Sequence, residues 1–134
     1  LPETTLPHNP EINGLTYLYH YSPGKATAMV NDASWTKAIF IRDPITRFLS
    51  AYLDKIVNHV YMENKRLNMY TFPQFISKVE HGYGDVHWNP QCSLVNCPKW
   101  MPNMDFIGTV ENIQADTKRL LQKIGAWEEY GSSG

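Results

Sequence analysis

The sequence predicts an α/β fold: a short parallel sheet flanked by helices, with one long irregular loop. Two short apolar runs, at residues 38–41 and 105–110, are each followed by an amphipathic helical pattern, which is the order typical of parallel strands. Between them, residues 82–104 combine glycines, prolines, cysteines and tryptophans with almost no periodicity. A loop of this length inside a compact domain indicates a functional role.

The bulk composition limits the possible classes of function. The chain has 134 residues, which suits a single compact domain, and 43% of them are hydrophobic. A formal net charge of −1 gives no support to nucleic-acid or membrane binding by the protein as a whole, so any anion site must be local. The sequence has no apolar run of the ~18 residues needed to span a bilayer. The two cysteines, Cys92 and Cys97, permit either one disulfide or two thiols.

The first part of the chain is expected to be an arm followed by two short elements. Residues 1–14 contain three prolines and end in a glycine, which predicts an extended arm. Residues 15–21 alternate loosely and predict a short strand. Ser22 and Pro23 then supply an N-cap and a first helical position, so a helix should follow and end near Asp32.

Residues 37–55 change their hydrophobic period in the middle and carry charge at the change. The run at 38–41 predicts a strand buried on both faces, and Arg42 ends it. Asp43 and Pro44 form an acidic N-cap and a first helical position, after which apolar residues recur at helical spacing as far as Val60. A strand, an arginine and a helix N-terminus together are an arrangement that binds anions. The alternative is a structural corner in which Arg42 pairs with a carboxylate.

Arg47 and Ser50 lie on the polar side of the same predicted helix. For Arg47 we expect a structural ion pair with Asp43 or Asp54, although it could also add to the field of an anion site.

The second half of the chain predicts two more helices and a strand. Thr71 and Gln74 form a capping-box pattern that begins a helix, which should stop by Gly82. The strand at 105–110 has Glu111 at its end, and a final helix runs to a terminating glycine at 125. Residues 128–134 are expected to be a flexible tail.

Four blocks in this order resemble the carbohydrate sulfotransferase family. They are RDPITRFLSAYLDK at 42–55, F-x-x-F-I at 72–76, D-x-H-W-x-P-Q at 85–91 and D-F-I-G-x-V-E at 105–111, the last preceding a D-x-x-x-L-L helix. The resemblance covers residues 15–125 and implies a partial P-loop-like sulfotransferase domain over residues 15–127. Members of the family are Golgi enzymes that transfer a sulfuryl group from 3′-phosphoadenosine 5′-phosphosulfate (PAPS) to a sugar hydroxyl. The resemblance therefore implies a carbohydrate acceptor, PAPS as donor and a Golgi lumen location.

The resemblance also assigns roles to individual residues. Arg42 and Ser50 match the arginine and serine that hold the 3′-phosphate of the nucleotide, and a guanidinium offers a forked, charged set of donors to phosphate oxygens. His87 is the candidate catalytic base, because histidine titrates in a suitable range. Related sulfotransferases use either histidine or glutamate, so the resemblance does not single out His87, and Glu111 is the weaker candidate. Asp85, His87 and Trp88 could instead brace the loop. Trp88 and Trp100 could stack on a sugar ring or anchor the loop. No metal is expected, since the spacing of the four His and Cys residues at 81–97 matches no standard zinc pattern.

One element of the family pattern is expected to be missing. The strand-loop-helix whose lysine grips the 5′-phosphosulfate precedes the matched region in the family, and residues before Leu15 do not supply it. This chain would then hold only the 3′-phosphate end of the cofactor site and would be inactive alone, because electrostatic stabilisation of the leaving phosphate is a large share of catalysis. The chain is either a fragment of a longer enzyme or a degenerate descendant. As a descendant it would be a non-catalytic subunit whose incomplete sheet is covered by a protein partner.

Overall fold

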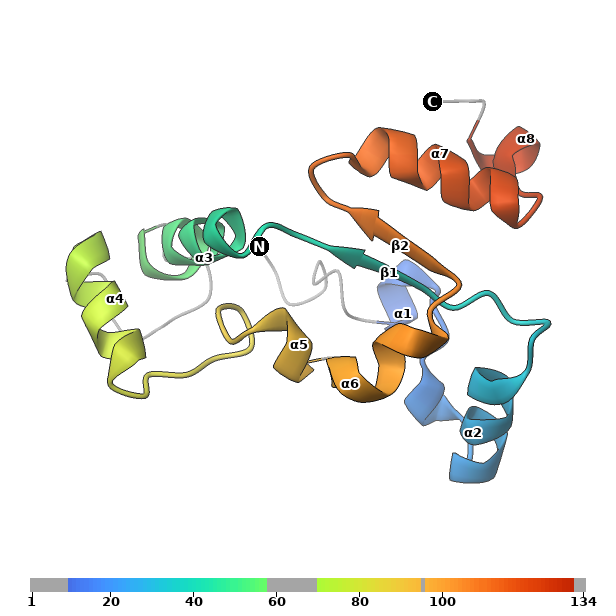
Figure 1. The fold of residues 1–134 in the computed structure, drawn as a ribbon, viewed down its shortest axis with the longest axis horizontal. Helices are drawn as coiled ribbons and strands as arrows, with labels where there is room; N and C mark the ends of the chain where they lie inside the picture. The colour runs from blue at the N-terminus through green and yellow to red at the C-terminus, as the bar shows by residue number, and fades with distance from the viewer. Residues whose placement is uncertain (1–9, 58–69, 95, 132–134) are drawn as a thin grey trace. The chain divides into compact units, whose positions relative to one another are not determined.

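The computed structural model describes residues 10–57, 70–94 and 96–131 and has a mixed α/β architecture (Figure 1). The chain divides into two compact units, Leu1–Thr36 and Lys37–Gly134, which we describe separately.

The first unit contains short helical elements. They are the helix α1 (Pro10–Asn13), a 3₁₀ turn (Leu18–His20) and the helix α2 (Pro23–Asn31). The start of α2 agrees with the prediction, because the Ser22 side chain accepts a hydrogen bond from the Lys25 N–H at 3.5 Å. The conformation of Pro10–Asn13 differs from the extended arm expected for 1–14, of which residues 1–9 lie outside the described residues.

The strand predicted at 15–21 is wrong. This segment turns back on itself, because the Tyr17 N–H donates to His20 Nδ1 at 3.2 Å and the ring of Tyr17 stacks on that of Tyr19 with their centroids 5.2 Å apart. These contacts join residues two and three positions apart, which an extended strand would separate.

The second unit is built on two parallel strands, β1 (Ala38–Ile41) and β2 (Phe106–Thr109), with Ala38 paired to Phe106 and Ile41 to Thr109. The short parallel sheet is therefore confirmed. The burial predicted for β1 on both faces is wrong: Ala38 is exposed and the other three residues are half-buried. Among the described residues β2 is the one strand that pairs with β1, so less of β1 is covered than in the interior of a wide sheet.

Gly108 is required by a close contact between the strands. A Cβ atom at this position would lie 2.5 Å from Phe40 Cε1 and 3.0 Å from Phe106 Cε1. The two aromatic rings, with centroids 6.0 Å apart, occupy the space that a side chain would need.

The strand β1 leads into the helix α3 (Pro44–Tyr52), which continues as a π-helical turn, Leu53–Val57. Asp43 caps α3 as predicted, because its Oδ1 accepts the Thr46 N–H at 2.8 Å. Residues 58–60, expected to extend this helix, lie outside the described residues.

The helix α4 (Phe72–Glu80) begins at the predicted capping box and ends before Gly82. At its start, Gln74 Oε1 accepts the Thr71 N–H at 2.9 Å.

The core of this unit lies where α3, α4 and the segment that follows α4 meet. Phe75 is fully buried, Ile56 is 1% exposed and Trp88 is 5% exposed. The Phe75 ring meets the Phe48 ring at 5.1 Å and the Trp88 ring edge to face at 5.1 Å. Aromatic packing therefore joins the segment that carries His87 to both helices.

The predicted irregular loop at 82–104 contains short helical turns: α5 (Gln91–Leu94), α6 (Cys97–Trp100) and a 3₁₀ turn (Met101–Asn103). Each of these turns has only three or four residues, which is too few to give a helical period, so the sequence pattern looks irregular.

After β2 come α7 (Ile113–Lys123) and α8 (Trp127–Tyr130). Asp116 of α7 is buried and its Oδ2 accepts the Thr109 N–H at 2.8 Å, which ties the helix to the end of β2. Residues 128–130, expected in a flexible tail, belong to α8. Within the described ranges, no helix has both the length and the apolar character needed to cross a membrane.

Replacing Phe75 by alanine should lower the free energy of unfolding by about 3–5 kcal/mol, because it leaves a cavity between α3, α4 and Trp88. Urea denaturation followed by tryptophan fluorescence measures this change. The matched variant Ile45→Ala removes an apolar side chain that is 79% exposed and should change the stability by less than about 0.5 kcal/mol. Equal effects of the two substitutions would contradict this placement of the core.

Candidate active site

Arg42 is fixed by its backbone at the carboxyl end of β1. Its N–H donates to Gln91 Oε1 at 3.0 Å, and Gln91 Nε2 donates to the Arg42 carbonyl at 2.6 Å. The next peptide group is held as well, because the Asp43 N–H donates to Glu111 Oε1 at 3.0 Å. Two residues distant in sequence therefore hold the turn between β1 and α3.

The Arg42 guanidinium has no carboxylate partner within the described part of the chain. The ion pairs there join Lys37 to Asp105, Lys55 to Asp54, His87 to Asp85 and Arg119 to Asp116. The alternative of a structural corner, in which Arg42 pairs with a carboxylate, therefore finds no support among these residues. Arg42 is half-buried, and none of the carboxylates in these four ion pairs neutralises its charge.

Ser50 lies on α3 one turn after Arg47 and one turn before Asp54, so these three residues share a face of the helix. Ser50 is half-buried. Its hydroxyl makes no hydrogen bond to the other described residues, so it can donate to a ligand.

Two backbone N–H groups at the N-terminus of α3 are already bound by side chains. The Thr46 N–H is bound by the Asp43 carboxylate at 2.8 Å and the Asp43 N–H by Glu111 at 3.0 Å. The bond from the Asp43 N–H holds the pKa of Glu111 below its usual value, so Glu111 stays ionised. Two carboxylates therefore already lie at this helix end, and an anion approaching it would have to be attracted by side chains such as Arg42.

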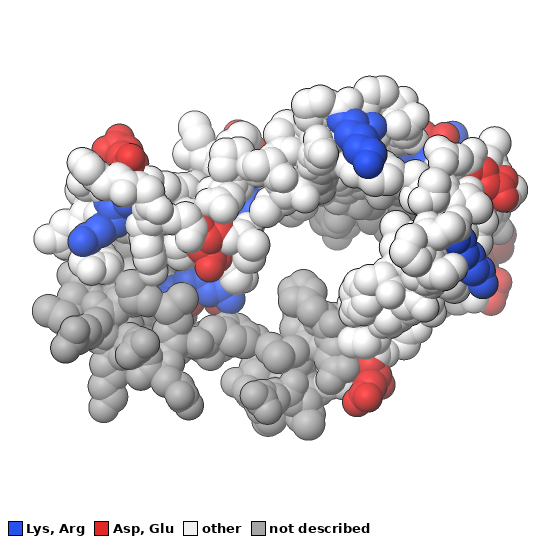
Figure 2. All heavy atoms as spheres, turned by 90° about the horizontal axis from the view of Figure 1, so that it is seen from below, with Lys and Arg blue, Asp and Glu red and all other residues white. Residues whose placement is uncertain are grey.

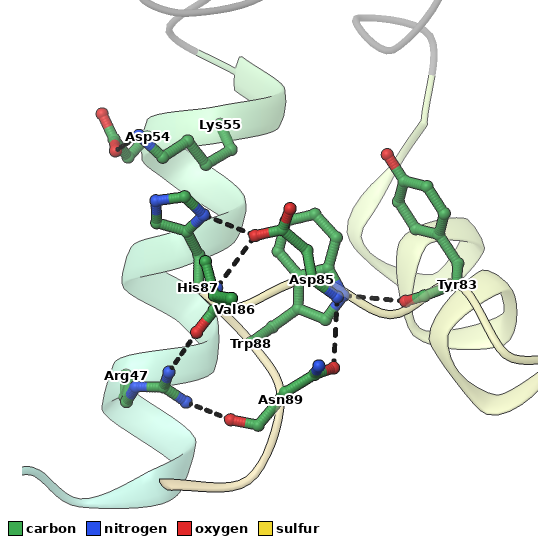
Figure 3. Close-up of polar contacts among 9 residues, drawn as sticks. All are labelled: Arg47, Asp54, Lys55, Tyr83, Asp85, Val86, His87, Trp88 and Asn89. Atoms are coloured by element: carbon green, nitrogen blue, oxygen red, sulfur yellow. Dashed lines mark hydrogen bonds and ion pairs between the residues drawn. The ribbon is translucent and has the colours of Figure 1, made fainter. Parts of the chain in front are cut away.

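His87 is exposed and forms a dyad with Asp85 (Figure 3). Its Nδ1 contacts Asp85 Oδ1, and the same oxygen accepts the His87 N–H at 2.9 Å. The other imidazole nitrogen points away from Asp85 in Figure 3. A carboxylate at Nδ1 selects the tautomer protonated there, which leaves Nε2 as a proton acceptor.

Asp85 is ionised at neutral pH. Its partial burial raises the pKa, but the hydrogen bonds from the His87 N–H and imidazole outweigh that effect, and Lys55 adds a favourable charge. The net pKa of Asp85 lies below its ordinary value. The carboxylate can therefore stabilise a positive charge on His87.

Arg47 anchors the segment that carries this dyad, but not through the predicted ion pair with Asp43 or Asp54. Its Nη1 donates to the Asn89 carbonyl at 2.7 Å and its Nη2 to the Val86 carbonyl at 2.8 Å (Figure 3). One guanidinium thus connects α3 to two carbonyls on either side of His87 and Trp88. The structural role expected for Arg47 is confirmed, with carbonyls as its partners in place of a carboxylate.

Trp88 anchors the loop. It is 5% exposed and its Nε1 donates to the Tyr83 carbonyl at 2.8 Å, so its ring is not available to a sugar. Trp100 is half-buried, and the Lys99 ammonium lies 5.2 Å from the centre of its ring.

Cys92 and Cys97 are free thiols in this structure. The hydrogen bond between the two side chains and partial burial raise the pKa of Cys97, which favours its neutral form. Among the described residues, no group of three His, Cys, Asp or Glu side chains is arranged to hold a metal ion.

Gln91 makes a contact at this turn that the sequence did not indicate. It is the last letter of the D-x-H-W-x-P-Q block, and nothing in that block shows that its partner is the backbone of Arg42.

The charge distribution is consistent with a local anion site. On the face drawn in Figure 2, the Lys and Arg side chains of the described residues are separated from one another, with acidic side chains among them. Among the described residues drawn in this view, the positive charges do not merge into one broad basic patch.

Comparison with known protein families gives a match over almost the whole chain. The model of the sulfotransferase family matches residues 3–133, so the chain belongs to this family. The resemblance inferred from the sequence is thereby confirmed.

Two curated relatives carry carbohydrate sulfotransferase names. Carbohydrate sulfotransferase 9 of Homo sapiens is 28% identical over 120 residues, covering 72% of this chain and 27% of the relative. Carbohydrate sulfotransferase 14 of Danio rerio is 28% identical over 112 residues, covering 67% of this chain and 30% of the relative. The chain thus spans less than a third of the length of either protein. No solved structure matches significantly.

Replacing Arg47 by alanine should loosen residues 85–90, because two carbonyls lose a charged donor. The expected loss is about 1–3 kcal/mol in the free energy of opening of this segment, which hydrogen exchange of its amides measures. Arg47→Lys should recover only part of it, since an ammonium cannot form the same planar fork. Unchanged exchange in both variants would contradict the anchoring role.

Proposed function

We propose that this chain supplies the 3′-phosphate side of a PAPS site and the catalytic base of a carbohydrate sulfotransferase. The observation that carries the proposal is the state of Arg42: its backbone is held at both polar groups, whereas its guanidinium has no carboxylate partner among the described residues. A half-buried cation on a fixed backbone, with no carboxylate partner in the described part of the chain, is suited to an external anion. Membership of the sulfotransferase family supports the choice of that anion.

Arg42 and Ser50 are the proposed ligands of the 3′-phosphate. The guanidinium can give two parallel hydrogen bonds to phosphate oxygens, and the hydroxyl can give a third from the helix that starts beside it. Because carboxylates already bind the Asp43 and Thr46 N–H groups at the start of α3, we expect these side chains to supply most of the binding energy at this end of the nucleotide.

His87 is the proposed base. When bound, PAPS supplies an activated sulfuryl group for transfer to an acceptor hydroxyl. His87 Nε2 is oriented to take the proton of that hydroxyl, because Asp85 holds the opposite nitrogen. Asp85 then stabilises the imidazolium. Glu111, the other candidate base, already accepts the Asp43 N–H and so has a structural role.

The acceptor is proposed to be a carbohydrate hydroxyl and the location the Golgi lumen. The names of the two curated relatives support the first, and the family resemblance described above supports the second.

A second candidate is a non-catalytic subunit that docks in a larger assembly. One observation favours it: apolar side chains at a spacing of four residues along α3 and the following π-helical turn are 43–79% exposed, namely Ile45, Leu49, Leu53 and Val57. Such a row is typical of a surface that packs against another polypeptide. In this role the chain needs no nucleotide, so nucleotide binding separates the two candidates.

Titration of the chain with 3′-phosphoadenosine 5′-phosphate in a calorimeter should give a binding isotherm. Arg42→Ala should weaken binding about 10- to 100-fold, the loss expected for a charged hydrogen-bond donor, and Ser50→Ala about 2- to 10-fold.

Two controls make this result specific. Lys78→Ala removes one exposed positive charge from α4 and should leave affinity unchanged. Adenosine 5′-monophosphate, which lacks the 3′-phosphate, should bind wild type and Arg42→Ala equally. Absence of binding by the wild-type chain would reject the PAPS site and favour the docking role.

His87→Ala should lower kcat about 10²- to 10⁴-fold in a sulfuryl-transfer assay of an active form of the enzyme, without a change in nucleotide affinity. Asp85→Asn should lower kcat less, because it removes the charge that stabilises the imidazolium but keeps the base. His81→Ala, at an exposed histidine at the end of α4, is the control. Full activity of His87→Ala would exclude His87 as the base.

A further inference from the structure

We infer that Gln91 is a positioning residue that places Arg42 for anion binding and ties it to the segment that bears His87. The inference rests on the proposed function for its consequence in nucleotide binding, but the positioning itself can be measured without any nucleotide.

The Gln91 side chain bonds to the Arg42 backbone as the backbone of a neighbouring strand would. The side-chain amide accepts the Arg42 N–H at 3.0 Å and donates to the Arg42 carbonyl at 2.6 Å, so it satisfies both polar groups of one residue. Both bonds lie in a partly buried region, where an unpaired peptide group is costly. Gln91 therefore extends the strand-like hydrogen bonding of β1 by one residue, to Arg42.

Gln91 is itself anchored through the segment that precedes it. Arg47 holds the carbonyls of Val86 and Asn89, and Trp88 lies in the core. Gln91 begins α5 two residues after Asn89. Arg42, the proposed phosphate ligand, is thus bonded to the same short segment, 85–91, that contains His87, the proposed base. Arg47 of α3 provides a second connection to this segment.

The chemistry of the contact requires glutamine. Glutamate would keep the acceptor for the Arg42 N–H but would replace the donor by an oxygen that faces the Arg42 carbonyl oxygen. Asparagine is one methylene shorter and cannot keep both bonds without moving the backbone. Alanine removes both bonds and leaves space.

The first measurement is the exchange rate of the Arg42 amide hydrogen, followed by NMR on the whole chain without ligand. In Gln91→Ala and Gln91→Glu this rate should rise relative to wild type: about 3- to 10-fold in the alanine variant, which loses one neutral hydrogen bond at this amide, and less in the glutamate variant. Gln122→Glu, at an exposed position on α7, is the control for the change of charge. If the alanine variant does not fold, the nearly isosteric glutamate variant carries the test.

The second measurement is a double-mutant cycle of binding to 3′-phosphoadenosine 5′-phosphate. Gln91→Ala should weaken binding about 3- to 10-fold in the wild-type background and have no effect in the Arg42→Ala background, because it acts through Arg42. An equal loss in both backgrounds would mean a general structural role and would overturn the inference. An unchanged Arg42 amide exchange rate would overturn it as well. If the wild-type chain binds no nucleotide, that result rejects the proposed function, while the exchange rate still decides the role of Gln91.

Discussion

The bridge from Arg47 to two backbone carbonyls is the interaction on which the candidate site depends. Val86 and Asn89 lie on either side of His87 and Trp88, so holding both carbonyls fixes the path of the chain between them. A guanidinium suits this task, because it presents parallel donors in a rigid plane and each bond to a charged donor is stronger than one between neutral groups. Without this bridge, the position of His87 relative to α3 would depend on the packing of Trp88 and on the bonds of Gln91 to Arg42.

The apolar and polar contacts of this segment work together. Trp88 enters the aromatic core beside Phe75, and its indole N–H is satisfied by the Tyr83 carbonyl at 2.8 Å. Asp85 and His87, its neighbours in the chain, stay at the surface, where their side chains are 33% and 47% exposed. Because Trp88 is buried while the adjacent His87 is exposed, one short segment can be anchored in the core and still present a proton acceptor to solvent.

The sequence predicted contacts between residues close together in the chain and missed contacts between distant residues. The caps at Asp43 and Thr71 join residues three apart, so the local sequence indicates them correctly. The bonds of Gln91 to Arg42 and of Glu111 to Asp43 join distant segments through backbone groups, which carry no residue-specific signal. For the same reason the residue types suggested an ion pair for Arg47, because a carbonyl partner cannot be seen in a sequence. The roles of Arg42, Ser50 and His87 in binding and catalysis remain predictions.

Gly108 has a consequence for the alignment of the two strands. Phe40 is paired with Gly108, and its ring occupies the space that a Cβ atom of residue 108 would need. A parallel strand that slips by two residues keeps its faces but changes its partners, and Phe40 would then stand opposite Phe106 or Val110. Both of these residues carry a side chain, so the ring could not lie over bare backbone as it does at Gly108. The absence of a side chain at Gly108 thus favours the observed register of β1 and β2. This register also determines where Arg42, which follows β1, lies relative to the end of β2.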